Sequence, residues 1–280
     1  MLKLRIITAL VLGPLIIWSV LSFSHPAIAI EMAAILCLAA WEWARLAGIK
    51  NQPGRIGFAI FIAVVIAAIA LLIHLDSSYI LSGLYLTGIF WLFALVMVIN
   101  SNRTVIKTLT KTSFPGVAGS LLFGVGILAG SFLSIVALHR DVKYGAYYIL
   151  ALLILIWVAD TAAYFSGKAF GKHKLAVNVS PGKSWEGVIG GMIATIIAAY
   201  LLTLYLNIDP ENILSFILVA VIAISFSIVG DLTESLFKRR VGVKDSSQIL
   251  PGHGGILDRI DSLTAAAPIF TLGLIMLGVQ

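Results

Sequence analysis

The stretch IGFAIFIAVVIAAIALLIHL, residues Ile56–Leu75, contains no Lys, Arg, Asp or Glu. A helix needs roughly 20 consecutive apolar residues to cross the hydrocarbon core of a bilayer, so this stretch predicts a transmembrane helix. The composition of the whole chain agrees, because 60% of its 280 residues are hydrophobic and 11% are charged, whereas about 25% are charged in ordinary globular domains. With a mean hydropathy of +1.05, the sequence predicts an integral membrane protein.

The same criterion, applied outward from this stretch, predicts an all-α polytopic bundle of about nine transmembrane helices. The predicted spans are Ile6–Phe23, Ala27–Ala47, Ile56–Leu75, Tyr79–Asn100, Pro115–Leu138, Gly145–Phe165, Gly187–Leu206, Ile213–Gly230 and Ser262–Leu277. The last is short, so we expect its helix to begin inside the polar segment before it. The first predicted span follows Lys3 and Arg5, as the apolar core of a signal peptide would. Its apolar run is long for such a core, so we expect an uncleaved helix.

The loops between these spans alternate in charge, and the alternation predicts their orientation. Of the 19 Lys and Arg, all but Arg140 and Lys143 fall on one side. They are Lys3, Arg5, Arg45, Lys50, Arg55, Arg103, Lys107, Lys111, Lys168, Lys172, Lys174, Lys183, Lys238, Arg239, Arg240, Lys244 and Arg259. Short loops rich in Lys and Arg stay in the cytoplasm, so we expect a cytoplasmic N-terminus and a C-terminus on the opposite side. Because the cations are spread over several short loops, we expect no nucleic-acid binding.

The sequence predicts a single polytopic membrane domain, residues 1–280, in which the charged loops are unevenly distributed. Residues 1–156 are expected to be mostly scaffold helices, and residues 157–280 the catalytic half, because two charged loops of the cytoplasmic side lie there.

The first of these loops follows Asp160, which lies inside a predicted span. A carboxylate there is costly and usually functional; the alternative is that it is solvated near the cytoplasmic end. On a helix, Asp160 shares a face with Tyr164 and Gly167. The lysines that follow could serve only as a topology signal and contact anionic lipid headgroups.

The segment SPGKS, residues 180–184, contains Ser180 and Lys183 but is not a Walker A motif. That motif requires glycine where this chain has Val177, and we expect no strand before the segment. We expect a serine–proline turn followed by a helix N-terminus, whose backbone N–H groups attract phosphate.

The second loop is SLFKRRVGVKDSSQILPGHGGILDRID, Ser235–Asp261. Asp231 is expected to close the span before it, and Asp258 and Asp261 are three residues apart, on one face of a helix. Three carboxylates from two helix ends could converge on Mg²⁺, which takes one or two protein carboxylates and completes its shell with water and phosphate. The alternative is that these acids only balance the neighbouring cations.

The cations and glycines of this loop suit an anionic, metal-bound phosphate ester. Arginine binds phosphate oxygens as a bidentate fork, and glycine permits close approach of the backbone to a ligand. The candidate phosphate-binding residues are Lys238, Arg239, Lys244 and Arg259, and the candidate turn consists of Gly252, His253, Gly254 and Gly255.

Two other functions remain open at this point. His253 and Asp258 form the H-x4-D pattern of glycerolipid acyltransferases, in which the aspartate orients a histidine base; a structural hydrogen bond of a loop histidine explains the pattern equally well. A membrane transporter of an anionic solute would use Asp160 and the loop cations, but transporter sites lie near the midplane, often between repeats, and we find no repeat.

The segment Ser235–Asp261 resembles the signature of the phosphatidate cytidylyltransferase, or CDP-diacylglycerol synthase, family. Similar to the same family are MLKLRII at 1–7, AAWEWARL at 39–46, the segment 160–171, SPGKSWEG at 180–187 and GDLTES at 230–235. The resemblance covers essentially the whole chain. The departure that we note is Ser184, where the family pattern has threonine.

The resemblance implies that the chain uses CTP and phosphatidic acid to make CDP-diacylglycerol and pyrophosphate, in a bacterial inner membrane and as a homodimer. It implies in-line attack by phosphatidate on the CTP α-phosphorus, assisted by Mg²⁺ and a second cation. The implied metal ligands are Asp231, Asp258 and Asp261, and the implied phosphate ligands are Lys238, Arg239 and Arg259. Ser180, Lys183 and the Gly252–Gly255 turn would hold the nucleotide. A CDP-alcohol phosphotransferase is not expected, because no DG-x2-AR pattern precedes the aspartates.

Overall fold

The computed structural model describes residues 2–103, 116–140 and 144–278 of the chain. Lys107, Lys111 and Lys143 of the predicted charge pattern lie outside these residues, as does Pro115 at the start of the fifth predicted span. The side chains of Lys3, Arg5 and Arg103 are likewise outside the description.

The described residues form a helical bundle with one short hairpin, which confirms the predicted all-α polytopic architecture. The helices are α1 (Leu2–Ser22), α2 (His25–Leu46), α3 (Gln52–Leu75), α4 (Ser78–Arg103), α6 (Val117–His139), α7 (Gly145–Phe170), α8 (Trp185–Tyr205), α9 (Ile213–Arg240) and α10 (Leu257–Met276). Strands β1 (Lys174–Ala176) and β2 (Ser180–Ser184) lie between α7 and α8, and a 3-10 turn, Pro210–Asn212, precedes α9.

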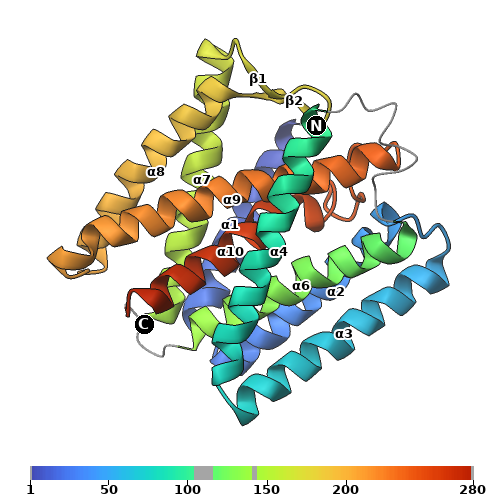
Figure 1. Cartoon of the computed structure of the whole chain (residues 1–280), viewed down its shortest axis with the longest axis horizontal. Helices are drawn as coiled ribbons and strands as arrows, with labels where there is room; N and C mark the ends of the chain where they lie inside the picture. The colour runs from blue at the N-terminus through green and yellow to red at the C-terminus, as the bar shows by residue number, and fades with distance from the viewer. Residues whose placement is uncertain (1, 104–115, 141–143, 279–280) are drawn as a thin grey trace.

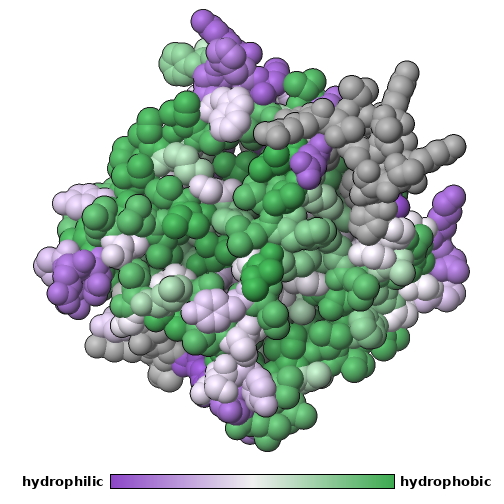
Figure 2. Space-filling view, viewed as in Figure 1, coloured by the Kyte–Doolittle hydropathy of each residue, from purple (hydrophilic) through white to green (hydrophobic). Residues whose placement is uncertain are grey.

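Eight of these helices, α2 to α10, are long and apolar enough to cross a membrane, and α1 contains a shorter apolar stretch, Leu10–Ser22. Figure 1 shows α7 and α8 side by side at one edge of the bundle, α2, α3 and α6 at the other, and α9 and α10 between them. The face seen in Figure 2 is mostly hydrophobic, with hydrophilic residues gathered at its rim. Large apolar side chains such as Leu86, 69% exposed, lie on the outside of the bundle, as expected where lipid replaces water.

Small residues let α7 and α8 approach closely. Ala159, Ala163 and Gly167 on α7 face Gly187 and Gly191 on α8. A Cβ atom on Gly187 would lie 2.9 Å from the carbonyl oxygen of Ala163, and one on Gly191 would lie 3.1 Å from that of Ala159. In a membrane, helices associate largely through such close backbone packing. The pair therefore forms a firm base for the hairpin that joins it.

The hairpin corrects two of our expectations. Ser180–Ser184 forms strand β2, antiparallel to β1, rather than a serine–proline turn. The turn lies at residues 177–179, where the Val179 N–H donates to the carbonyl of Ala176. A strand, β1, therefore does precede the segment, and Val177 is what excludes the Walker A motif. The predicted helix start is confirmed, because Ser184 caps α8 by accepting from the Gly187 N–H at 3.2 Å.

Helix α9 also differs from the prediction, because it does not end near Asp231. It continues to Arg240 and stops before Gly242, whose positive φ of 73° favours glycine after a helix end. No glycine or proline interrupts residues 231–240, so hydrophilic character alone does not end the helix. Helix α10 begins at Leu257, inside the polar segment as expected. Asp231 and Lys238 consequently lie on one helix, and Asp258 and Asp261 on the next.

Gly230 determines how closely α9 and α10 pack. A Cβ atom there would collide with the carbonyl oxygen of Asp261 and lie 2.9 Å from the Ala265 side chain. We expect Gly230→Ala to destabilise the fold by about 1–3 kcal/mol, the usual cost of overpacking, as measured by thermal unfolding of the purified protein in detergent. Gly57→Ala on α3 is the control, because its added methyl group meets open space. Equal melting temperatures for the two variants would contradict the argument.

Candidate active site

Four elements contribute side chains to one polar region: the end of α7, the hairpin, the C-terminal part of α9 and the first turn of α10. Lys183 on β2 pairs with Asp231 on α9, with Nζ 2.5 Å from Oδ2. Arg239 Nε donates to the carbonyl of Val179 at 3.3 Å. These two contacts hold the hairpin against α9.

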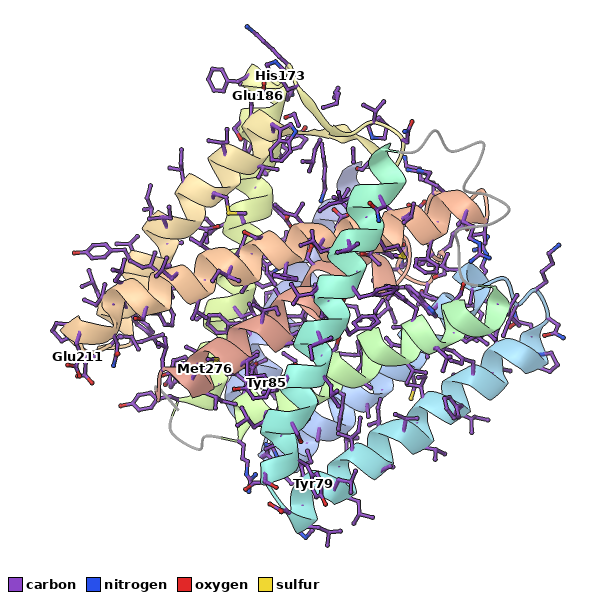
Figure 3. All side chains as sticks on the ribbon, viewed as in Figure 1. Tyr79, Tyr85, His173, Glu186, Glu211 and Met276 are labelled. Atoms are coloured by element: carbon purple, nitrogen blue, oxygen red, sulfur yellow. The ribbon has the colours of Figure 1, made fainter. Side chains whose placement is uncertain are left out.

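The charged ends of the helices are segregated along the bundle. Figure 3 shows His173 and Glu186 together at the hairpin end, where His173 Nδ1 lies 2.7 Å from Glu186 Oε1. Glu211, just before α9, lies at the opposite end. Arg45, near the end of α2, donates to the carbonyl of Ser246 at 3.2 Å. The basic ends of α2, α7 and α9 therefore lie on the same side as the start of α10, in agreement with the predicted charge pattern.

A buried cluster of charges connects α9 with α10. Lys238 is 8% exposed, and its Nζ donates to Glu234 Oε2 at 3.0 Å and to Asp258 Oδ1 at 2.7 Å. Glu234 is 2% exposed, and its Oε1 receives no hydrogen bond from the described residues. Asp261 interacts electrostatically with both Glu234 and Asp231. Lys238 therefore offsets part of the negative charge of this cluster, and Lys183 offsets that of Asp231. Removal of one partner from a buried ion pair is strongly destabilising.

Asp258 also shapes the glycine turn. Its Oδ2 accepts from the Ser246 N–H at 2.9 Å, the Ser246 hydroxyl at 2.9 Å and the Gly255 N–H at 2.7 Å. Gly252 and Gly254 have positive φ of 78° and 83°, a conformation that L side chains rarely adopt. The predicted turn is thus present, and Asp258 holds it.

The remaining predicted cations lie at the surface. Arg239, Lys244 and Arg259 are exposed. Arg259 Nε donates to the carbonyl of His253 at 3.0 Å, which places this guanidinium beside the glycine turn.

A cavity of about 410 Å³ lies between α7, α8, α9 and β2. Asp160, Ser180 and Lys183 are among its polar lining residues. Other parts of its wall are apolar, with Val188, Met192, Ile224 and Ile228. Asp160, Tyr164 and Gly167 all line it, as their predicted common helix face requires.

Among the described residues, no three acidic, histidine or cysteine side chains are close enough to hold a metal ion as they stand. The carboxylates still suit Mg²⁺, which needs only one or two protein carboxylates. Asp231, Glu234 and Asp261 interact with one another, and Glu234 Oε1 is buried without a donor from the described residues. The donor set therefore fits a hard divalent cation.

Sequence reasoning gave no role to Glu234. Its spacing from Asp231 and Lys238, at three and four residues, places the three on one helical face. That signal was hidden by the expectation that the helix ends near Asp231.

The acyltransferase hypothesis requires Asp258 to orient His253. In the described structure, the hydrogen bonds of both Asp258 oxygens come from Lys238, Ser246 and Gly255. Both oxygens of Asp258 are thus engaged by the ammonium group of Lys238 and by the segment around the glycine turn.

Comparison with known proteins agrees with this geometry. Residues 3–277 match the cytidylyltransferase family. The chain is 44% identical over 271 residues to a phosphatidate cytidylyltransferase of Pseudomonas aeruginosa, covering 96% of each chain. It is 38% identical to the phosphatidate cytidylyltransferase of Haemophilus influenzae, over 97% of this chain and 98% of the relative, and 35% identical to that of Thermotoga maritima, over 96% and 94%. The chain is therefore an integral membrane nucleotidyltransferase and belongs to the cytidylyltransferase family.

Proposed function

We propose that this chain transfers CMP from CTP to phosphatidic acid and releases CDP-diacylglycerol and pyrophosphate. The observation that carries the proposal is the cavity between α7, α8 and α9, which joins a polar region at Asp160 and Lys183 to an apolar wall at Met192 and Ile228. A lipid phosphate needs both environments. The names of the relatives support the same substrates.

The phosphate of phosphatidic acid is the nucleophile in this proposal. One of its oxygens forms a bond to the α-phosphorus of CTP, while the bond from that phosphorus to the bridging oxygen breaks and pyrophosphate leaves. The attacking oxygen is already ionised, so the reaction needs no strong general base. Catalysis then consists of positioning and charge stabilisation.

The cations of the site have distinct roles in this scheme. Lys183 lines the cavity and bonds Asp231, so it can exchange its carboxylate partner for a substrate phosphate. Arg259, beside the glycine turn, and Arg239, beside the hairpin, are exposed to the aqueous side and would bind the phosphates of CTP. Lys238 is buried between carboxylates and would keep them in place.

The proposed ligands of Mg²⁺ are Asp231, Asp258 and Asp261, as the sequence predicts. Asp258 already accepts four hydrogen bonds, so Asp231 and Asp261 have more free lone pairs, and Glu234 Oε1 adds a further oxygen. When bound, Mg²⁺, with a second cation beside it, would neutralise charge on the reacting phosphates.

The proposal includes a location. The basic ends of the helices and the cavity mouth would face the cytoplasm of a bacterial inner membrane, where CTP is available, with the C-terminus on the opposite side. The assembly would be a homodimer.

The reaction is tested with the purified protein in detergent, phosphatidic acid and CTP labelled at the α-phosphorus. We expect label in a chloroform-soluble product, none with EDTA, and recovery with Mg²⁺. Asp231→Asn and Asp261→Asn should each lower the rate by roughly 100-fold, the loss typical when one electrostatic group of an active site is removed. Asp209→Asn, exposed just before α9, should retain the wild-type rate. Folded wild-type protein that moves no label into lipid would sink the proposal.

The cavity is tested by adding volume to its wall. Val188 lines the cavity, whereas its neighbour Ile189 is 57% exposed on the outside of α8. We expect Val188→Phe to raise the apparent KM for phosphatidic acid in mixed micelles by roughly tenfold, within the range for one misfitted apolar group, while Ile189→Phe leaves it unchanged. If the two variants behave alike, the lipid binds elsewhere.

A further inference from the structure

Glu42 lies near the C-terminal end of α2, far from the catalytic half of the sequence, and it is 0% exposed. Its Oε1 accepts from the Ser247 hydroxyl at 2.5 Å and from the Ile256 N–H at 3.0 Å. Its Oε2 accepts from the Ser246 hydroxyl at 3.1 Å and from the Leu257 N–H at 2.7 Å. Every one of these donors lies between residues 246 and 257, so one carboxylate holds both ends of the segment that contains the glycine turn.

The N-terminus of α10 depends on this contact. The residue at its N-cap position, Ile256, has no side chain that can accept a hydrogen bond, and the structure gives the helix no local cap. The N–H groups of a first helical turn need acceptors, and a negative charge there is favoured by the helix dipole. Glu42, on α2, supplies both the acceptor oxygens and the negative charge.

Gly255 is shaped by the same carboxylate. A Cβ atom at this position would collide with the Ser246 hydroxyl and lie 2.6 Å from Oε1 and 2.7 Å from Oε2 of Glu42. The Ser246 hydroxyl and the Glu42 carboxylate together therefore occupy the space that a side chain at this position would need.

No Lys, Arg or His of the described residues forms an ion pair with Glu42. Arg55 interacts with this carboxylate electrostatically, but from beyond ion-pair distance. The cost of burying the charge is therefore offset mainly by its hydrogen bonds, and charge-assisted bonds from N–H and O–H groups are strong. Small shifts of residues 246–257 would break several of these bonds at once. The site thus has a strong preference for one position of the segment.

We propose that Glu42 is a positioning residue of the active site. It fixes the first turn of α10, and with it Asp258, Arg259 and Asp261, relative to the carboxylates of α9. It touches no reacting atom. This inference rests on the proposed function for its kinetic consequences, while its structural consequence can be measured independently.

The test compares Glu42→Gln with Glu31→Gln, which removes the same charge near the other end of α2. The side-chain NH2 group of glutamine would face N–H and O–H donors of residues 246–257 and cannot accept from them. We therefore expect this segment to be held less firmly. We expect the full-length variant in detergent to lose roughly 100-fold in kcat and to raise the KM for CTP roughly tenfold, effects in the range seen when supporting residues of a site are removed. Glu31→Gln should change neither parameter.

Hydrogen–deuterium exchange followed by mass spectrometry gives the second readout. Peptides covering residues 246–258 should exchange roughly tenfold faster in Glu42→Gln, the factor expected from loss of a hydrogen bond to a charged group, while peptides of α3 and α6 exchange at the wild-type rate. If Glu42→Gln fails to fold, Ser247→Ala is the second variant, which removes one donor to Glu42 together with the acceptor of the Ile249 N–H. It should show the same changes at roughly a third of their size.

A merely structural role would lower the folded fraction and kcat together, without a change in the KM for CTP. Wild-type KM and wild-type exchange of residues 246–258 in the folded variants would overturn the inference. If wild-type protein transfers no CMP, the proposed function fails, and the exchange experiment still decides whether Glu42 holds the segment.

Discussion

The pairing of Lys238 with Glu234 and Asp258 is the constraint on which this structure depends. Charges inside a helical bundle in a membrane are costly unless they are paired, and here one ammonium group serves carboxylates from two helices. The pair therefore sets the register of α9 against α10. It also gathers more carboxylates than cations in one place, and that imbalance suits the proposed binding of a divalent cation.

Packing of small residues makes this arrangement possible. Gly230 allows α10 to lie directly against α9 next to the carboxylates, and Gly187 and Gly191 do the same for α7 and α8. Because the backbones are close, short side chains can meet across the helices. The hairpin between α7 and α8 then carries Lys183 to Asp231. The charge cluster therefore depends on the close packing of the helices.

The site lies between an apolar and a polar environment. The cavity has an apolar wall formed by long apolar helices, and polar residues contributed by α7 and the hairpin. A reaction between a lipid phosphate and a nucleotide requires such a boundary, since neither substrate can enter the other's solvent. Residues from the first half of the chain also take part, because Glu42 on α2 holds the turn in place.

Much of this protein could be predicted from sequence, because apolar length and loop charge act locally along the chain. Eight of the nine predicted spans, the helix face shared by Asp160 and Tyr164, and the early start of α10 were predicted in this way and confirmed, whereas α1 has only a shorter apolar stretch. The continuation of α9 to Arg240 was not, because polar residues remain helical when partners from other elements satisfy them. The hairpin that contains Ser180–Ser184 was not predicted either, because it depends on pairing between strands. The hydrogen bonds from Ile256 and Leu257 to Glu42 join residues that are far apart in sequence. Apolar length and loop charge therefore determined the membrane architecture, and the polar motifs predicted the type of chemistry that we propose for the site. Only the tertiary structure decided which charges pair, since that depends on distances between helices.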